Sequence, residues 1–294
     1  MVVLLVGLGN MGSKYLNVLD QIKSITKIII VDKVCKEISI NKKYTFYKNI
    51  KEIKDKNEIN FAIISTPTNT HYNVFNELKN FCKNLLIEKP IFKDLNECNF
   101  FVKEISSLYN VSTGFIERFN PVVKFIKNNI DLNDIIKIDF LRYSKKPQQI
   151  TDVGVDLDLG IHDIDLSFFI LNKRYKNIKS LKKCYYKEDN KTLISSILID
   201  YNNIICNIQS SWKNNSAKRE IYITLKNNDK YKFDLIKKTY CKNSQETVSL
   251  EHNNQLIDQI QSFINIINNK NDNTIAGYEN GIDALKVLLN ENIN

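Results

Sequence analysis

The residues most able to do chemistry begin directly after the first apolar run of the chain. Gly7-Leu8-Gly9-Asn10-Met11-Gly12 follows Val2–Val6 and opens an amphipathic segment. Glycines at this spacing allow a tight turn, close approach of the backbone to a pyrophosphate, and close packing of a helix on a strand. The first N–H groups of that helix would bind the anion. The motif therefore predicts a dinucleotide site at Gly7, Gly9, Asn10, Met11 and Gly12, the alternative being a purely structural glycine turn.

An acidic residue stands where such a site needs one. Asp32 ends the second apolar run, twenty residues after Gly12. A carboxylate there can accept hydrogen bonds from both hydroxyls of the adenosine ribose, and it repels a 2′-phosphate. Lys33 follows directly and weakens this charge preference. We predict that Asp32 and Lys33 contact the cofactor, and that NAD is preferred over NADP.

A polar segment follows the third apolar run, Phe61–Ile64. It reads Ser65-Thr66-Pro67-Thr68-Asn69-Thr70-His71. Ligands of open α/β sheets bind beyond the carboxyl ends of the strands, so this segment is expected to line the cofactor crevice. Thr70 is also expected to cap a helix that starts near His71, and the two roles are compatible.

Glu88-Lys89-Pro90 ends the fourth apolar run, Leu85–Ile87. A lysine at the same sheet edge as the glycine loop can reach a bound substrate. The positive charge of a nicotinamide would favour the neutral, proton-accepting form of that lysine. The alternative is an ordinary surface pair of Glu88 and Lys89.

A second acid/base candidate lies in the middle of the chain. On an α-helix, Asp158, His162 and Asp165 are spaced i, i+4 and i+7 and share one face. An Asp beside a His fixes its tautomer and tunes its basicity, as general acid/base chemistry requires. The alternatives are a solvated face with a capping Asp and a divalent metal site. With three His in the whole sequence, a multi-His centre within one subunit is excluded, and we predict no metal.

The first third of the chain alternates the elements that would position these residues. Short apolar runs are typical of parallel strands buried on both faces, and amphipathic stretches between them indicate helices. This alternation predicts a doubly wound parallel sheet. The expected strands are Val2–Val6, Ile28–Val31, Phe61–Ile64, Leu85–Ile87 and Val111–Ile116, and the expected helices are Met11–Ile22, His71–Phe81 and Leu95–Leu108.

After Pro121 the pattern changes to a run of strands. Asn202-Asn203 and Asn227-Asn228-Asp229 have the composition of hairpin turns between them. We predict an α+β domain with a largely antiparallel sheet over residues 118–294, after a cofactor domain over residues 1–117. The expected strands are Ile135–Tyr143, Ile178–Tyr186, Thr192–Tyr201, Ile204–Trp212, Glu220–Leu225 and Lys230–Leu235, and the expected helices are Leu157–Leu171, Gln255–Ile267 and Gly281–Leu289.

Composition excludes several classes of protein. A chain of 294 residues with 43% hydrophobic content can bury packed cores, so it is not intrinsically disordered. No apolar run approaches the roughly 20 residues that span a bilayer, and the six Cys show no CxxC pair, so we expect a cytoplasmic protein with reduced thiols. The net charge is +9, but only four cations are Arg and the Lys are spread out, which disfavours nucleic acid as a partner.

Taken together, these motifs resemble the glucose-fructose oxidoreductase and inositol dehydrogenase family, also called Gfo/Idh/MocA. The resemblance covers essentially the whole chain, in the family's order and spacing. It implies a Rossmann domain followed by an α/β domain whose open sheet commonly forms contacts between subunits, and hence a homodimer or homotetramer through the C-terminal sheet. The segments that carry it are the glycine loop, Ser65–His71, Glu88–Pro90, Gly114–Pro121 and Asp158–Asp165.

The resemblance also implies roles for particular residues. Lys89 would contact the reacting hydroxyl, His162 would be a second acid/base group or hydroxyl ligand, and Asp158 would orient it. Glu88, Thr66 and Pro67 would lie against the nicotinamide ribose. The remaining cofactor candidates are Ser65, Thr68 and His71. Glu117, Arg118 and Asn120 would face the substrate, with Arg118 alternatively a residue that joins parts of the fold. Further substrate candidates are Arg142, from its charge, and Asp165.

The substrate is less specified than the reaction. Glu117–Pro121 together with Asp152–Val155 and Asp158–Asp165 is similar to the branch that oxidises position 3 of UDP-N-acetylglucosamine or its uronic acid. Arg142, Lys145 and Lys146 are candidate cations for a diphosphate. Three alternatives stay open: another sugar-nucleotide ketoreductase, a polyol or inositol dehydrogenase, and a non-catalytic NAD-binding sensor. Lys89, Asp158 and His162 together argue against the sensor, which needs only the cofactor loop.

Overall fold

The computed structural model describes residues 1–34, 43–148 and 153–290. It divides the chain into two compact units, which are described separately. The first comprises Met1–Gly114 and Leu256–Gly281, and the second comprises Phe115–Gln255 and the residues from Ile282 onward. Asp152, one of the residues that suggested the substrate branch, lies outside the described residues. Among the described residues, no helix is long and apolar enough to cross a membrane.

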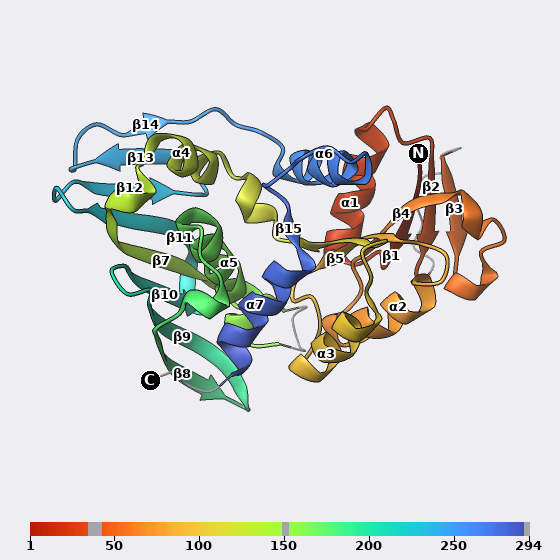
Figure 1. Cartoon of the computed structure of the whole chain (residues 1–294), viewed down its shortest axis with the longest axis horizontal. Helices are drawn as coiled ribbons and strands as arrows, with labels where there is room; N and C mark the ends of the chain where they lie inside the picture. The colour runs from red at the N-terminus through yellow and green to blue at the C-terminus, as the bar shows by residue number, and fades with distance from the viewer. Residues whose placement is uncertain (35–42, 149–152, 291–294) are drawn as a thin grey trace. The chain divides into compact units, whose positions relative to one another are not determined.

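The first unit is built on a twisted sheet whose central strands are parallel (Figure 1). Valine, leucine and isoleucine fill these strands, and both faces are buried, as expected when helices cover both sides. In the described residues the strand order is β15 (Ala276–Gly277), β6 (Asn110–Gly114), β5 (Asn84–Glu88), β4 (Ile59–Ile64), β1 (Val2–Val6), β2 (Lys27–Val31) and β3 (Tyr44–Tyr47), with only β15 antiparallel to its neighbour.

Helices cover the two faces of this sheet. Figure 1 shows α1 and α6 on one face and α2 and α3 on the other. Phe61 of β4 packs edge-on against Phe263 of α6, with ring centroids 5.6 Å apart. This sheet confirms the predicted doubly wound architecture. The helices are α1 (Asn10–Gln21), α2 (His71–Leu78), α3 (Leu95–Glu104) and α6 (Gln255–Ile267).

The register of the sheet brings the predicted motifs to one edge. Val6 pairs with Val31 and Ile64, and Ile64 pairs with Ile87. The residues that follow these four strands therefore leave the sheet at the same carboxyl edge. These residues begin the glycine loop, the Asp32 turn, the Ser65 segment and Glu88-Lys89.

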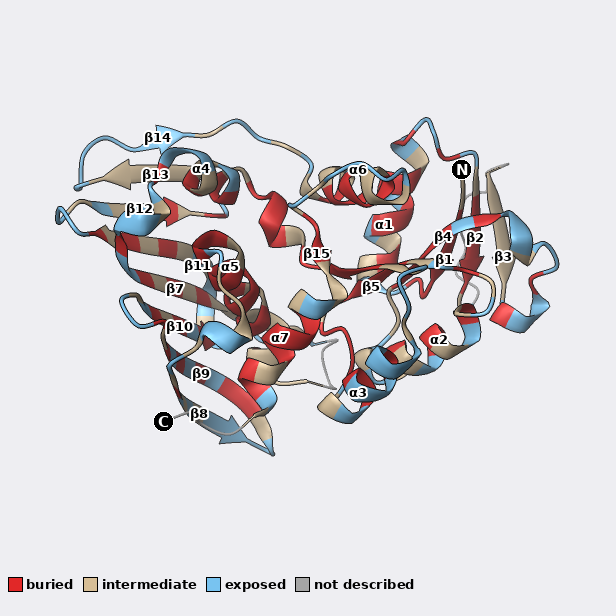
Figure 2. Cartoon of the chain, viewed as in Figure 1, coloured by how far each residue is buried: buried red, intermediate tan, exposed pale blue. Residues whose placement is uncertain are grey.

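The second unit contains a larger sheet, which is antiparallel except where β10 pairs with β7. Buried and exposed residues alternate along β9, as expected for a sheet with one covered face (Figure 2). The predicted largely antiparallel sheet is confirmed. The described order is β14 (Val248–Ser249), β13 (Thr239–Lys242), β12 (Lys230–Asp234), β11 (Lys213–Leu225), β7 (Ile135–Lys145), β10 (Ile205–Ser211), β9 (Lys191–Asp200) and β8 (Ser180–Glu188).

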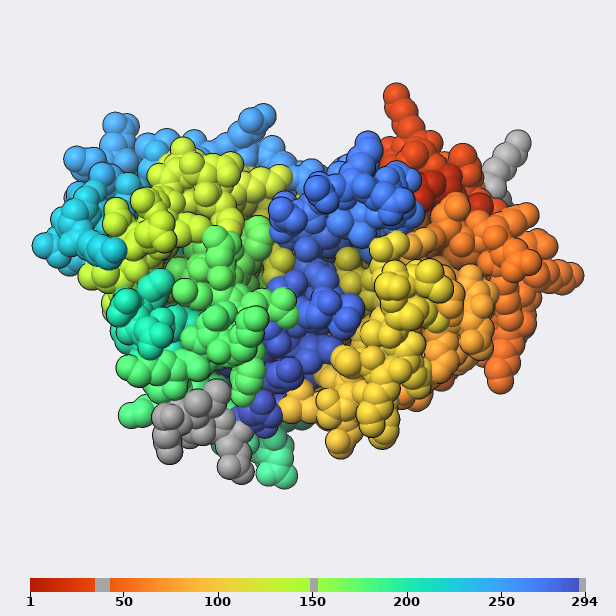
Figure 3. Space-filling model, viewed as in Figure 1, coloured from red at the N-terminus to blue at the C-terminus, as the bar shows by residue number. Residues whose placement is uncertain are grey.

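Helices cover one face of this second sheet. Phe125 of α4 (Pro121–Asn129) stacks on Tyr240 of β13, with ring centroids 4.3 Å apart. Figure 3 shows the yellow-green atoms of α4 beside the cyan and blue atoms of β12 and β13. Helix α5 (Ile161–Leu171) packs on β7 and β10, and α7 (Tyr278–Leu289) closes the described chain. The predicted hairpin turns are confirmed: Asn202 joins β9 to β10 and Asn228 joins β11 to β12, both with positive φ.

Two features of this unit were not predicted. The expected regular α-helix from Leu157 begins instead with a π-helical turn, Asp156–Gly160, which leads into α5. Gly160 crosses β10 so closely that a Cβ would lie 3.2 Å from Ser210 Oγ. Helix α4 was not predicted, although Asn120 caps it by accepting from Val122 N and Pro121 occupies its first turn.

Candidate active site

The glycine loop is packed tightly against the end of β4. Gly7 has φ +94°, and a Cβ there would lie 2.8 Å from the backbone of Ser65 and Thr66. A Cβ at Gly12 would lie 2.0 Å from Gly7 O. Ser65 Oγ donates to Gly7 O at 2.9 Å. Glycine is therefore required at Gly7 by backbone conformation and at Gly12 by helix packing, as the dinucleotide motif predicts.

A cavity of about 550 Å³ opens beside this loop in the first unit. Gly9 borders it, and a Cβ at Gly9 would meet no atom within 4 Å, so the backbone there is accessible. Of the predicted cofactor residues, seven line the cavity: Gly7, Gly9, Asp32, Lys33, Ser65, Thr66 and Pro67. The lining does not include Asn10, Met11, Gly12, Thr68, His71, Glu88 or Lys89.

Sequence reasoning missed part of this lining. Lys48, Asn49, Asn73 and Glu77 also border the cavity. Lys48 and Asn49 follow the half-buried edge strand β3, which has no continuous apolar run to reveal it. Asn73 and Glu77 are one helical turn apart on α2, inside the helix predicted over His71–Phe81, so their shared face could have been found from the sequence.

Asp32 is held in place by the backbone around it. Its Oδ2 accepts from Leu8 N of the glycine loop at 2.6 Å, and its Oδ1 accepts from Val34 N at 2.9 Å. Each carboxylate oxygen has a further lone pair for a ribose hydroxyl. The residues present thus fit the adenosine half of a dinucleotide.

The hydrogen bonds of the Ser65–His71 segment differ from those predicted. Thr70 does not cap α2: its hydroxyl donates to Pro67 O at 2.7 Å and lies 2.8 Å from Thr66 Oγ1. The His71 ring is buried, with Nδ1 3.0 Å from Pro90 O and Nε2 2.9 Å from Thr66 O. Burial lowers the pKa of His71. His71 therefore joins the segment after β4 to the segment that carries Lys89.

Glu88 is more buried than Lys89. Glu88 is buried and Lys89 is half-buried. Tyr15 Oη lies 2.5 Å from Glu88 Oε1, and Lys89 N donates to Glu88 Oε2 at 3.3 Å. Glu88 is thus a buried residue that is bonded to the backbone of Lys89. The two residues are therefore not an ordinary surface ion pair.

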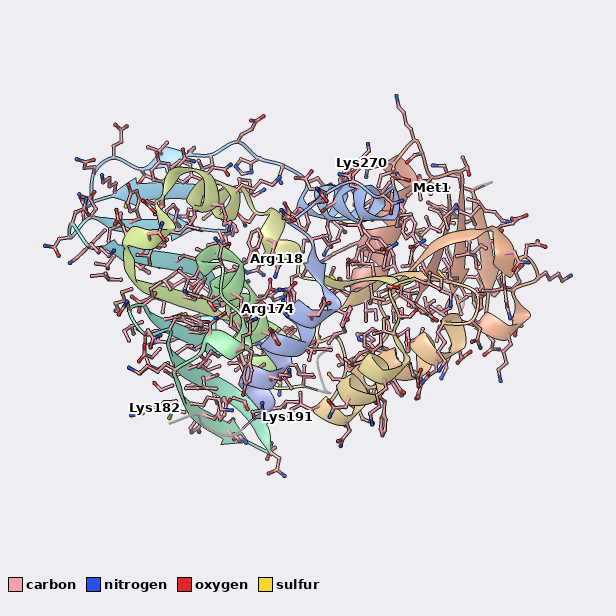
Figure 4. The ribbon with its side chains drawn as sticks, in the orientation of Figure 1. Met1, Arg118, Arg174, Lys182, Lys191 and Lys270 are labelled. Carbon is pink, nitrogen blue, oxygen red and sulfur yellow. The ribbon has the colours of Figure 1, made fainter. Side chains whose placement is uncertain are left out.

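In the second unit, the segment after β6 is fixed by buried arginines. Arg118, labelled in Figure 4, donates through Nε and Nη2 to Asp165 of α5 at 2.8 and 2.6 Å. Arg142 of β7 donates to Asp163 of α5 and, through Nη1 at 2.9 Å, to Glu117. These contacts support the joining role considered for Arg118 and give Arg142 a similar one.

Glu117 is the centre of this network. Its Oε1 accepts from Arg142 and also from Arg219 of β11, at 2.9 Å in both cases. Burial raises the pKa of Glu117, but the two guanidiniums outweigh it and hold that pKa below its usual range. Asp163 lies beside the Glu117 charge, and burial raises its pKa despite Arg142. Asn120 donates to Leu235 O as well as capping α4.

His162 is more exposed than its two acidic neighbours on α5. It is half-buried, with its ring centroid 6.1 Å from that of Phe115, whereas Asp163 and Asp165 are fully buried. Asp158, in the π-turn, is half-buried like His162. The three residues predicted to act together thus differ in environment: Asp165 is buried against Arg118, whereas Asp158 and His162 are half-buried.

Known proteins resemble the chain in both sequence and fold. Residues 1–113 match the family model described as the Gfo/Idh/MocA oxidoreductase family, NAD-binding Rossmann fold. This match confirms the predicted resemblance over residues 1–113. A curated relative, scyllo-inositol 2-dehydrogenase (NAD(+)) of Bacillus subtilis (strain 168), is 26% identical over 157 residues, which is 50% of this chain and 44% of that protein. The chain thus matches less than half the length of this relative.

Two solved structures share the fold over nearly the whole chain. UDP-N-acetylglucosamine 3-dehydrogenase from Acidithiobacillus ferrooxidans has a TM-score of 0.81 and 18% identity, covering 98% of this chain and 95% of its own. Scyllo-inositol dehydrogenase from Lactobacillus casei, solved with NAD(H) and scyllo-inositol, has a TM-score of 0.74 and 18% identity at the same coverage.

Proposed function

We propose that this chain, whose residues 1–113 belong to the NAD-binding Rossmann fold of the Gfo/Idh/MocA oxidoreductase family, is a dehydrogenase that oxidises a secondary hydroxyl of a sugar or polyol. One observation carries the proposal. The glycine loop, Asp32 and Glu88-Lys89 follow three strands of one parallel sheet at the same edge. A cofactor site and a candidate base are therefore parts of one unit.

The residues of the first unit suit NAD. The accessible backbone at Gly9 and the first N–H groups of α1 can donate hydrogen bonds to a pyrophosphate. The Asp32 carboxylate can accept hydrogen bonds from a ribose. When bound, NAD would supply the hydride acceptor that alcohol oxidation needs. By family resemblance, Glu88, Thr66 and Pro67 would support the nicotinamide ribose.

Oxidation of a secondary alcohol also requires a base for the hydroxyl proton. We assign this role to Lys89, whose amine accepts the proton when neutral. His162 is proposed as the second acid/base group or hydroxyl ligand, with Asp158 as its orienting residue. We propose that the second unit supplies the substrate domain, after a cofactor domain over residues 1–117. Of residues 118–294, which the sequence assigned to the substrate domain, Leu256–Gly281 lies in the first unit.

The substrate we favour is a UDP-N-acetylhexosamine or its uronic acid, oxidised at position 3. Three cations are candidates for binding the diphosphate of such a substrate. Arg142 forms ion pairs with buried carboxylates, whereas Lys145 and Lys146 are exposed. The second candidate is a cyclic polyol, which needs no diphosphate site, and the inositol dehydrogenase relative favours it.

A substrate panel tests the proposal. Purified protein is mixed with NAD and, separately, with UDP-N-acetylglucosamine, its uronic acid, UDP-glucose, myo-inositol and scyllo-inositol, and NADH absorbance is followed. We expect NADH with a UDP-N-acetyl sugar. Turnover of inositols alone would establish the second candidate. NAD binding without turnover of any compound would contradict both.

Cofactor preference is tested at Asp32. Replacement of Asp32 by serine removes charge-assisted acceptors for the ribose hydroxyls, and each such bond is worth about 1.5–3 kcal/mol. We expect the Kd for NAD to rise roughly tenfold or more, while NADP binding improves or stays level because Lys33 and Lys48 border the same cavity. Titration of both cofactors by calorimetry measures the ratio. Equal weakening of NAD and NADP would argue against a specificity role.

We also propose that the chain forms a homodimer or homotetramer through the uncovered face of its larger sheet. Exposed apolar side chains of β8, β9 and β10 alternate onto this face: Tyr186, Ile194, Leu198 and Ile205. Leu198→Glu is expected to give a monomer in light scattering, because a charge would be desolvated in the contact. Leu108→Glu, at an exposed site of the first unit, is the matched control. A wild-type monomer would refute the proposal.

A further inference from the structure

A second cavity, of about 510 Å³, is lined only by residues of the second unit. It opens where β7 and β10 begin and where β9 and β11 end, beside the last turn of α5. Leu171 at this end of α5 borders the cavity, whereas His162 lies in the first turn of the helix. A helix of 11 residues is about 16 Å long. The cavity is therefore separate from the proposed acid/base residues of the same unit.

The floor of this cavity is apolar. Ile135, Leu171 and Tyr201 line it and are buried. The Tyr201 hydroxyl is bonded inside the unit, since its Oη lies 3.0 Å from Ser167 Oγ. Carbon surface of this kind suits a ring or another apolar group, and the volume is within the roughly 300–1,000 Å³ of small-molecule sites.

Two asparagines that line the cavity have amide groups with a fixed orientation. Lys127 Nζ donates to Asn172 Oδ1 at 2.7 Å, so Asn172 Nδ2 is left to donate. Asn133 Nδ2 donates to Asp131 Oδ1 at 3.1 Å, so Asn133 Oδ1 is left to accept. An ammonium only donates and a carboxylate only accepts, so neither amide can be turned over without losing its bond. A donor and an acceptor together suit the edge of a heterocyclic base.

Lysines give the cavity a positive charge. Lys173 and Lys226 line it, and the described lining residues include no Asp or Glu. Arg174, labelled in Figure 4, is paired with Asp283 at 2.6 Å, whereas the half-buried Lys173 beside it forms no ion pair with the described residues. Lys226 lies 3.9 Å from Asp134, and because both side chains are exposed this pair is weak. An anionic group is thus the complement of this part of the cavity.

We propose that this cavity binds a nucleoside monophosphate. The base lies on the apolar floor against Asn133 and Asn172, and the phosphate is bound by Lys173 with Lys226. An apolar floor, fixed amides and cations border one cavity, which favours a single ligand with a ring and an anionic group over inorganic phosphate or an apolar molecule. Binding here requires no turnover, so the proposal is independent of the proposed dehydrogenase activity.

Calorimetric titration with AMP and UMP tests the proposal. NAD is present at saturation, because it would occupy the cavity beside the glycine loop, where a nucleotide is also expected to bind. We expect saturable binding of at least one of the two nucleotides. Inorganic phosphate and the nucleoside without its phosphate should each bind about tenfold more weakly or less, because each makes only part of the contacts. Absence of nucleotide binding, or phosphate binding of equal strength, would overturn the proposal.

Lys173→Glu locates the bound nucleotide. Reversal of this charge removes the partner of the phosphate, so the Kd should rise about tenfold or more. Lys176→Glu is the matched control, because Lys176 is exposed on η7 (Tyr175–Asn177) and does not line the cavity. Its Kd should stay close to that of the wild type. Equal Kd values for the two variants would mean that the nucleotide binds elsewhere, and the assignment of this cavity would be wrong.

Asn172→Gly separates recognition of the base from attraction of the phosphate. Asn172 follows α5 with φ +51°, a backbone conformation that glycine adopts without strain, so the helix end is retained while the amide is lost. We expect weaker binding of the nucleotide and unchanged binding of inorganic phosphate. If nucleotide binding is also unchanged, the site attracts anions without recognising a base, and the nucleotide assignment is refuted.

Discussion

Replacement of Lys89 by methionine is expected to abolish measurable turnover while leaving NAD binding nearly unchanged. Removal of a general base lowers kcat by roughly 10²- to 10⁴-fold. Methionine keeps the length and apolar stem of lysine, and Lys89 is not among the residues that line the cavity beside the glycine loop. Turnover with the best substrate of the panel and a calorimetric Kd for NAD are the two measurements.

The control for this variant is Lys83→Met. Lys83 is an exposed lysine of the same unit that donates to Tyr109 Oη and Lys79 O, on the segment before β5. It should retain wild-type kcat, because its charge lies at the amino end of the strand whose carboxyl end carries Lys89. If Lys89→Met turns over at a rate near that of Lys83→Met, the base is another group and the assignment of Lys89 is wrong.

Local patterns in the sequence predicted the cofactor unit well. Its central strands are continuous runs of Val, Leu and Ile because helices bury both faces. Gly7 and Gly12 must be glycine because an added Cβ would lie 2.0 to 2.8 Å from neighbouring backbone atoms. Strand β3 was missed because Tyr44–Tyr47 is a half-buried edge with no apolar run. Short strands such as β15 depend on a partner strand far along the chain, which no local pattern reveals.

Side-chain contacts between residues far apart in the sequence could not be predicted for the same reason. Tyr15 and Gln259 are 244 positions apart, and neither belongs to a motif that would have suggested their contact. Arg142 was predicted as a substrate contact from its charge alone, whereas its environment is set by Glu117 and Asp163, which come from different elements. A sequence identifies a cation, but only the fold determines whether water, substrate or a buried carboxylate surrounds it.

The buried arginine network gives the second large expected effect, on stability. Arg142→Met should lower the free energy of unfolding by about 3–5 kcal/mol, because it leaves Glu117 and Asp163 buried without their shared guanidinium. Arg219→Met is the matched control. Arg219 bonds the same Glu117 oxygen, but its side chain is 46% exposed, so its loss should cost about 1 kcal/mol or less. Urea unfolding at neutral pH measures both.

The pH dependence separates a charge effect from a packing effect. In the wild type, Arg142 and Arg219 hold the pKa of Glu117 below its value in the unfolded chain. The ionised Glu117 therefore stabilises the folded protein at pH values above the unfolded pKa, and this stabilisation is lost as the pH falls through the folded pKa. In Arg142→Met the buried carboxyls favour protonation, so that variant loses less stability on acidification. The difference between wild type and Arg142→Met should therefore narrow between neutral pH and about pH 4. A difference that stays constant with pH would mean that Arg142 stabilises α5, and the His162 it carries, through packing of its stem rather than through its charge.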